Sequence, residues 1–150
     1  MRSFLGCLML FTVLGCNSSP EKETANPKIV DGHTLYEVYQ PSEMSSLMKG
    51  MYAYNEQIKR DIKEGNTPSE FPEEFLKIHT AEMSDTKSRT DNFQLYSGKY
   101  IQAQRLVFVE DSTASLVKRH NDAIGMCISC HKTECTGPIP KIKKLLITEE

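Results

Sequence analysis

The chain has 150 residues, with 18 Lys or Arg against 20 Asp or Glu and a formal net charge of −2 at pH 7. Because domains that bind nucleic acid concentrate positive charge, this balance excludes nucleic acid as an expected partner. The length suits one domain with a real hydrophobic core.

Residues 1–15 are predicted to be a lipoprotein signal peptide. Arg2 supplies the positive start, and the apolar run after it is too short to span a bilayer. The run ends in Val13-Leu14-Gly15-Cys16, which resembles a bacterial lipobox. The resemblance implies that Cys16 is lipidated, and that the protein is exported and anchored on the periplasmic side or the cell surface. The choice between inner and outer membrane stays open.

Residues 16–33 are predicted to be a flexible tether. The segment is polar, contains Pro20 and Pro27, and shows no helical or strand period. A chain of this length spans roughly 20–25 Å on average, which is enough to clear a membrane surface. We therefore expect a single folded domain over residues 34–150.

Four helices are predicted after the tether, because apolar residues recur there at spacings of three and four. The four-residue segment 106–109 is rich in β-branched residues and leaves a short strand as the alternative to the end of the third helix. A proline-containing break is expected over 137–140, followed by a short tail over 141–147. The predicted helices cover residues 40–64, 69–83, 91–109 and a stretch that begins near Ser112.

The fourth predicted helix carries the most informative motif. Its residues Val117, His120, Ile124, Cys127 and His131 are separated by three or four positions, so they share one face. We expect this face to be turned towards the core.

The segment Cys127-Ile128-Ser129-Cys130-His131 has the C-x-x-C-H pattern of covalent haem attachment. The two cysteines would form thioether bonds to haem, and the histidine would bind the iron as its proximal ligand. The pattern predicts one haem c.

Three other interpretations use similar cysteines, of which a plain disulfide across two residues is rare and strained in a helix. A zinc site needs a second set of ligands, for which only scattered histidines remain besides Cys135. A thioredoxin-type pair needs a βαβ setting that the predicted helices do not provide. Cys135 is expected to be a free buried thiol, since Cys16 is assigned to lipid.

The chain resembles the cytochrome c′ family and its low-spin relatives over residues 40–135. Besides the C-x-x-C-H motif near the end of the chain, Asn121, Gly125 and the segment 44–51 match the family pattern. The resemblance implies an all-α four-helix bundle with haem on the last helix. Just after the histidine the family often has an aromatic residue and an arginine, whereas this chain has Lys132-Thr133-Glu134-Cys135. The family's arginine early in the first helix is also absent.

The resemblance also implies that the first helix supplies the side chain on the distal side of the iron, and Met48 occupies that position. Met44 and Met51 lie on the same stripe, where core packing is the simpler interpretation of each methionine. His79 is a minor candidate for the distal position. His120 shares a face with His131, so it is expected to pack or to contact a propionate.

Electron transfer through a His131/Met48-ligated haem is the expected function, with no catalytic residues. The alternative is binding or sensing of nitric oxide or carbon monoxide at a five-coordinate haem, and haem enzyme chemistry ranks last. The expected partners are redox proteins and the membrane, reached through the lipid anchor. A homodimer is left open.

Overall fold

The computed structural model describes residues 28–30, 33–35, 40–68, 70–84, 86–110 and 113–148. Chain contacts divide it into two units, residues 1–39 and 40–150. The predicted signal peptide, the lipidation site Cys16 and the helix start at Ser112 lie outside the described residues.

The first unit contains a small hairpin that begins in the segment predicted as a tether, 16–33, and ends just after it. Strands β1 (Lys28–Val30) and β2 (His33–Leu35) pair antiparallel, with Ile29 opposite Thr34. These strands were not predicted from the sequence. Six residues are too few for an alternating pattern of polar and apolar residues to be recognised.

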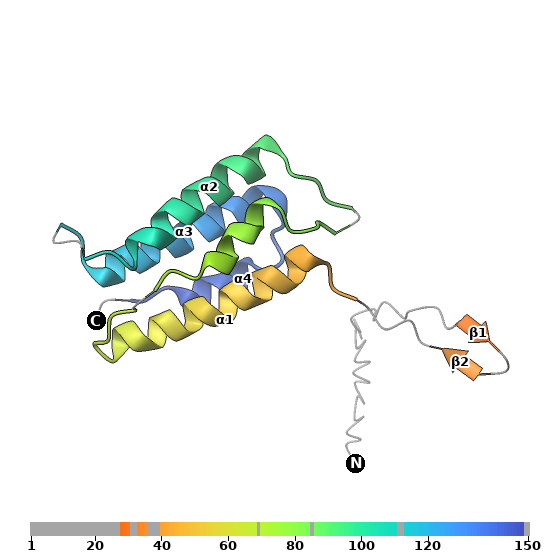
Figure 1. Ribbon diagram of the computed structural model, residues 1–150, viewed down its shortest axis with the longest axis horizontal. Helices are drawn as coiled ribbons and strands as arrows, with labels where there is room; N and C mark the ends of the chain where they lie inside the picture. Colours follow the sequence, from red (N-terminus) through yellow and green to blue (C-terminus); the bar gives the residue numbers. More distant parts are fainter. Residues whose placement is uncertain are drawn as a thin grey trace, which may run out of the picture. The chain divides into compact units, whose positions relative to one another are not determined.

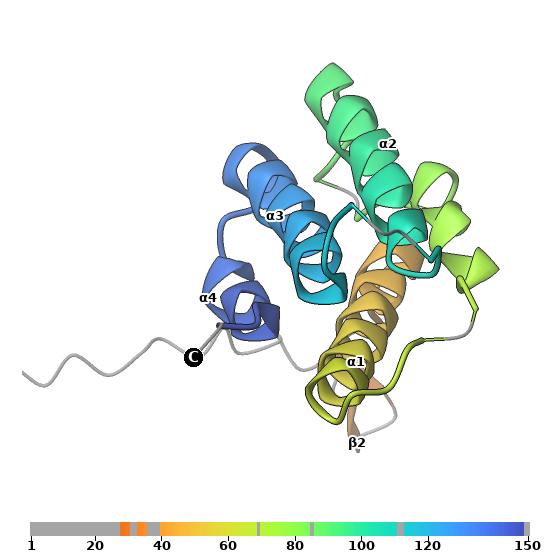
Figure 2. The same ribbon diagram turned by 90° about the vertical axis from the view of Figure 1, so that its left-hand side faces the viewer.

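All regular elements in the described part of the second unit are helices, which confirms the predicted all-α class for this unit. Its longest helices are α1 (Glu43–Lys63), α2 (Asp91–Leu106) and α3 (Leu116–Glu134). Figures 1 and 2 show α2 and α3 lying side by side, with α1 on the other side of the body and the C-terminal segment next to α3. No helix among the described residues has the length and apolarity needed to cross a membrane.

Helix α1 confirms the first predicted helix and is bounded by local signals. The Ser42 hydroxyl accepts a hydrogen bond from the Ser45 backbone N–H at 3.1 Å, which caps the start. Gly65 has a φ of 80° just after the end, a conformation that favours glycine.

The second predicted helix, 69–83, is wrong in length and type. The structure has a 3₁₀ helix instead, η1 (Glu73–His79), of seven residues. The following segment cannot continue the helix because its backbone bonds to the start of α1. The Met44 N–H donates to the Glu82 carbonyl at 2.9 Å, and the Glu82 N–H donates to the Glu43 carboxylate at 2.8 Å.

Helices α2 and α3 are slightly shorter than predicted. Helix α2 ends at Leu106 and continues as a turn, which excludes a strand over 106–109. Helix α3 is capped by Ser115, whose hydroxyl accepts from the Lys118 N–H at 3.1 Å. After the break come α4 (Ile139–Ile142), which contains Pro140 in its first turn, and the 3₁₀ helix η2 (Lys143–Leu145).

The buried apolar residues form three clusters, one of which lies beside the predicted haem cysteines. This cluster joins α1, η1 and α2 through residues such as Met51, Ile78 and Tyr100, with Cys127 and Cys130 packed against it. A second cluster fills the space between Ile58, Val107 and Ala123. The third joins α3 to the C-terminal segment through Ile124, Ile142 and Leu145.

Candidate functional site

The three residues of the C-x-x-C-H motif lie in the last turns of α3 and line one pocket. Cys127, Cys130 and His131 are three and four residues apart, so the helix turns them to the same side. All three are half-buried, and neither cysteine is in a disulfide. The predicted site residues of α3 are thus brought together.

The pocket is bounded by three further elements. Helix α1 contributes Met48 and Met51, and η1 contributes Ile78. Helix α2 adds the aromatic residues Tyr96 and Tyr100. The room inside the pocket is small, about 30 Å³, and its mouth opens to solvent.

The imidazole of His131 is oriented by the end of its own helix. Its Nδ1 lies 2.9 Å from the Cys135 carbonyl oxygen. Because a carbonyl can only accept, Nδ1 carries the proton and donates. Nε2 then keeps its lone pair, which is the arrangement found where a histidine ligates a metal through Nε2.

The two thiols are held in their neutral form. Burial raises the pKa of Cys127 to about 12, and the neighbouring Cys130 adds to the shift. Burial likewise raises the pKa of Cys130 to about 11, with a further contribution from Glu134. A redox-active C-x-x-C pair needs a lowered thiol pKa, so this environment does not favour a thioredoxin-type function.

A zinc site made by the protein alone also lacks support. Within the described ranges, no three His, Cys, Asp or Glu side chains come together as a set that could hold a metal ion. The prediction that Cys135 is buried is wrong, because Cys135 lies exposed just after the end of α3, where its backbone carbonyl accepts a hydrogen bond from His131.

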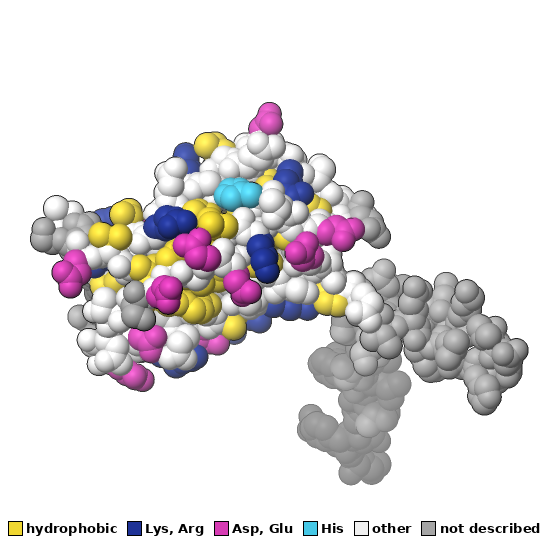
Figure 3. All heavy atoms as spheres, viewed as in Figure 1, with side chains coloured by type: hydrophobic (Ala, Val, Ile, Leu, Met, Phe, Trp, Pro, Cys, Tyr) yellow, Lys and Arg dark blue, Asp and Glu magenta, His cyan; other side chains and the backbone are white. Residues whose placement is uncertain are grey.

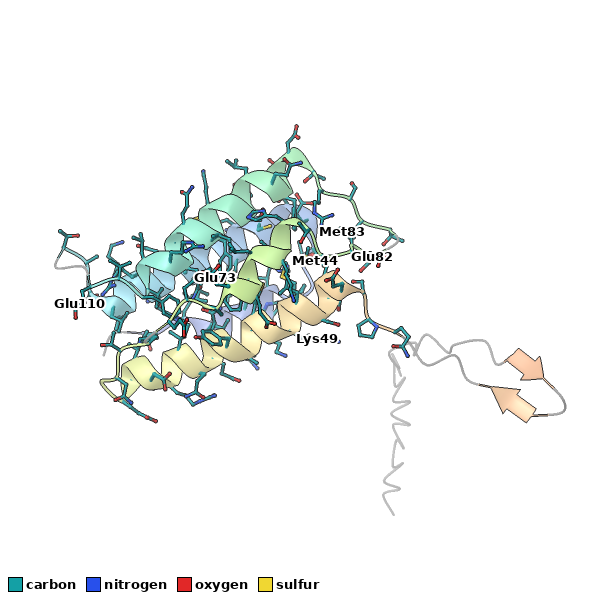
Figure 4. The ribbon with its side chains drawn as sticks, viewed as in Figure 1. Met44, Lys49, Glu73, Glu82, Met83 and Glu110 are labelled. Carbon is teal, nitrogen blue, oxygen red and sulfur yellow. The ribbon has the colours of Figure 1, made fainter. Side chains whose placement is uncertain are left out.

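The methionines of α1 differ in their surroundings. Met48 is half-buried and lines the pocket, whereas Met44 is 7% exposed and packs in the core near Glu82 and Met83, which Figure 4 labels. Met51 both lines the pocket and packs in the core, where its side chain is 5% exposed.

One methionine of the pocket was not predicted. Met126, on α3, lines the pocket beside Cys127. It lies off the main apolar stripe, and only its spacing of four from Cys130 could have indicated its position.

The two histidines considered as alternatives lie away from the pocket. His79 is exposed on η1 and is not among the lining residues. His120 is fully buried, and its Nε2 donates to the Leu145 carbonyl at 2.9 Å. Burial lowers the pKa of His120, and the nearby Lys59 lowers it further while the Leu145 carbonyl opposes the shift. His120 is therefore a neutral anchor for the C-terminal segment.

Tyr100 joins the pocket to a buried polar group. Its hydroxyl accepts a hydrogen bond from Asn55 Nδ2 at 3.2 Å, and burial raises the pKa of Tyr100 well above its ordinary value. Asn55 lies on the buried side of α1, where it is 2% exposed. Its bond to Tyr100 explains why a polar residue is tolerated there.

Comparison of the chain with protein families, curated proteins and solved structures finds no significant match.

Proposed function

We propose that the protein is a monohaem c-type cytochrome that transfers electrons. One observation carries the proposal: Cys127, Cys130 and His131 line a single pocket, with Met48 on a different helix of the same pocket. When bound, haem supplies a reversible one-electron change at iron. No catalytic side chain is required, since the protein only has to hold and orient the group.

The residues present fit a covalently held haem. Two neutral thiols at a spacing of three stand on the helix face that borders the pocket. His131 has Nδ1 bonded to the Cys135 carbonyl, which leaves Nε2 for the iron. The remaining lining is mostly apolar, and an apolar wall keeps water away from a redox centre.

Met48 is proposed as the second iron ligand. It reaches the pocket from α1, while His131 reaches it from α3. Met126 borders the pocket too, but it shares α3 with His131 and approaches from that same side. A thioether ligand raises the potential of haem iron and suits electron transfer.

The architecture that goes with this proposal is a four-helix bundle with haem on its last long helix. Helices α1, α2 and α3 are three of its members, and η1 takes the position of the fourth in a shortened form. Its support is that all four elements contribute to the lining of the same pocket.

The proposal includes export and a lipid anchor on Cys16, with the domain facing the periplasm or the cell exterior. It rests on the signal-like sequence of residues 1–16. Because a single acyl chain binds a membrane only marginally, stable anchoring requires more than one chain on Cys16. Metabolic lipid labelling of the full chain and of Cys16→Ser checks this part, and equal labelling of both proteins would contradict it.

The decisive experiment is the spectrum of the protein made in a host that attaches haem to exported proteins. We expect haem that survives acid–acetone extraction, a low-spin oxidised spectrum with a methionine-to-iron charge-transfer band, and slow or no carbon monoxide binding. A high-spin protein that takes up carbon monoxide readily would instead establish the gas-binding alternative. A protein with stoichiometric zinc and no haem would contradict both.

A further inference from the structure

Four exposed lysines lie on the end of α3 and on the C-terminal segment, and we call them the lysine patch: Lys132, Lys141, Lys143 and Lys144. The two elements are in contact, since Ile128 of α3 packs against the cluster of Ile142 and Leu145. Lys132 follows Ile128 by one helical turn and so stands on the side of α3 that faces this segment.

The lysine patch lies next to the proposed haem site. The Lys141 Nζ stands 4.3 Å from the centre of the Tyr52 ring. Tyr52 and Cys127 both pack against the Ile142 and Leu145 cluster. Lys141 and a cysteine that would carry the haem are therefore linked through Tyr52 and this one apolar cluster.

The segment that displays the lysines is held firmly to the helical body. Lys59 of α1 donates from Nζ to the carbonyls of Lys144 and Leu146, each at 2.8 Å. His120 of α3 donates to the carbonyl of Leu145 at 2.9 Å, and Asn121 donates to that of Ile147 at 2.8 Å. Four consecutive carbonyls are thus bound, so the lysine patch has a fixed position relative to the pocket.

The charge of the lysine patch is not neutralised by the described part of the chain. On the face seen in Figure 3, basic and acidic side chains are interspersed over η1 and its neighbours. Residues of η1 form ion pairs, Glu74 with Lys77 and Glu73 with Arg105. None of the four lysines of the patch pairs with a carboxylate of the residues that the structure describes. Among the described residues the patch therefore carries four lysine charges that no ion pair engages, on a chain with a net charge of −2.

We propose that the lysine patch is the docking surface for an acidic redox-partner protein. The inference rests on the proposed function, because it assigns the patch to the exchange of electrons with the haem. An acidic surface would be attracted to the patch and would bring its own redox centre close to the pocket. Charge complementarity of this kind raises association rates by about ten- to a thousandfold and weakens as salt is added.

The test measures the local field with small redox reagents and the full haem-loaded protein in neutral detergent. The reduced protein passes one electron from its iron to ferricyanide, an anion, or to tris-phenanthroline cobalt(III), a cation. We expect Lys141→Glu with Lys143→Glu to slow the ferricyanide reaction by about tenfold at low salt and to speed the cobalt reaction. The difference should shrink at high salt.

A matched control makes the same charge change far from the pocket. Lys63→Glu with Lys118→Glu alters exposed side chains at the end of α1 and the start of α3, and its thermal unfolding is compared with that of wild type because Lys118 pairs with Asp122 at 2.6 Å. We expect this variant to react with both reagents at close to the wild-type rates. Equal effects in the two variants would mean that net charge alone sets the rates, and would overturn the docking surface.

Two further outcomes separate this inference from its rivals. With the protein inserted in vesicles, an amine-reactive ester should label Lys141 and Lys143 equally well in neutral and in phosphatidylglycerol-containing membranes. Protection of these lysines by the anionic vesicles alone would assign the patch to lipid and overturn the partner proposal. Absence of covalent haem would contradict the proposed function, whereas a haem-loaded protein insensitive to charge reversal contradicts only the docking surface.

Discussion

The two halves of α3 differ in how completely they are packed. In the first half Arg119, His120, Ala123 and Ile124 are buried, whereas every residue from 125 to 131 is only half-buried. The same helical period thus runs through a closed interface and then through the wall of a pocket.

The polar groups of the two halves differ in the same way. His120 and Asn121, in the first half, bond the backbone of the C-terminal segment, and Asn121 both donates to and accepts from Ile147. In the second half the side chains of Cys127 and Cys130 border open space. We infer that the first half stabilises the fold and the second half is left for a bound group.

Removal of both cysteines from the second half of α3 should have the largest effect on the protein. We expect Cys127→Ala with Cys130→Ala to lose all covalent haem, because neither thioether bond can form. Without the group the pocket lining loses the contacts that haem would make, and the loss of contacts inside a core costs about 2–5 kcal/mol of unfolding free energy. Acid–acetone extraction and thermal unfolding measure the two effects, with Cys135→Ala as a control that should keep its haem. Haem that stays covalently attached to the double variant would contradict the assignment.

A truncation in the packed half should destabilise the protein without touching the cofactor. Ile124 is 0% exposed, so Ile124→Ala should lower the free energy of unfolding by about 2–5 kcal/mol. The same change at the half-buried Ile128 should cost less. Denaturant unfolding of the two haem-loaded variants gives the difference, and both should keep the wild-type absorption spectrum. An equal loss at the two positions would mean that the halves of α3 are packed alike.

The methionines of α1 extend the comparison to the other side of the pocket. Met48→Ala should turn the iron high-spin, open it to carbon monoxide and lower its potential, since a thioether favours the ferrous state. Met44→Ala is the matched control, because Met44 is buried in the core and does not line the pocket. It should reduce stability and leave the spectrum unchanged. A wild-type spectrum in the Met48 variant would remove this residue from the iron.

The long helices could be predicted because each repeats its apolar residues over several turns and has a local cap. Ser42 and Gly65 mark α1 in the sequence itself. The second helix could not be bounded in this way. Its final residues are drawn into hydrogen bonds with Met44 and Glu43, about 40 positions earlier in the chain, and helical spacing says nothing of such partners.

The C-x-x-C-H motif in α3 could be recognised directly in the sequence, whereas the rest of the site depends on tertiary contacts. The hydrogen bond from His131 to the Cys135 carbonyl follows from where α3 ends. Met126 joins the pocket from a position off the stripe, and the C-terminal segment is anchored by Lys59 from α1. These relations join parts of the chain whose distance in space is set only by the folded core.

The smallest expected effect is a pH dependence that arises in the packed half. Burial lowers the pKa of His120 in the folded protein below its ordinary value of 6.5. The unfolded chain therefore binds a proton first as pH falls, so stability is complete above about pH 6.5 and declines below it, by at most about 1.4 kcal/mol per pH unit. Unfolding of the haem-loaded protein at pH 7.5 and 5.5 measures this decline, and His120→Gln should reduce it. His79→Gln changes an exposed histidine and should leave the decline as in wild type. If both variants keep the full decline, the acid sensitivity comes from other groups, and the buried imidazole is not what ties the C-terminal segment to pH.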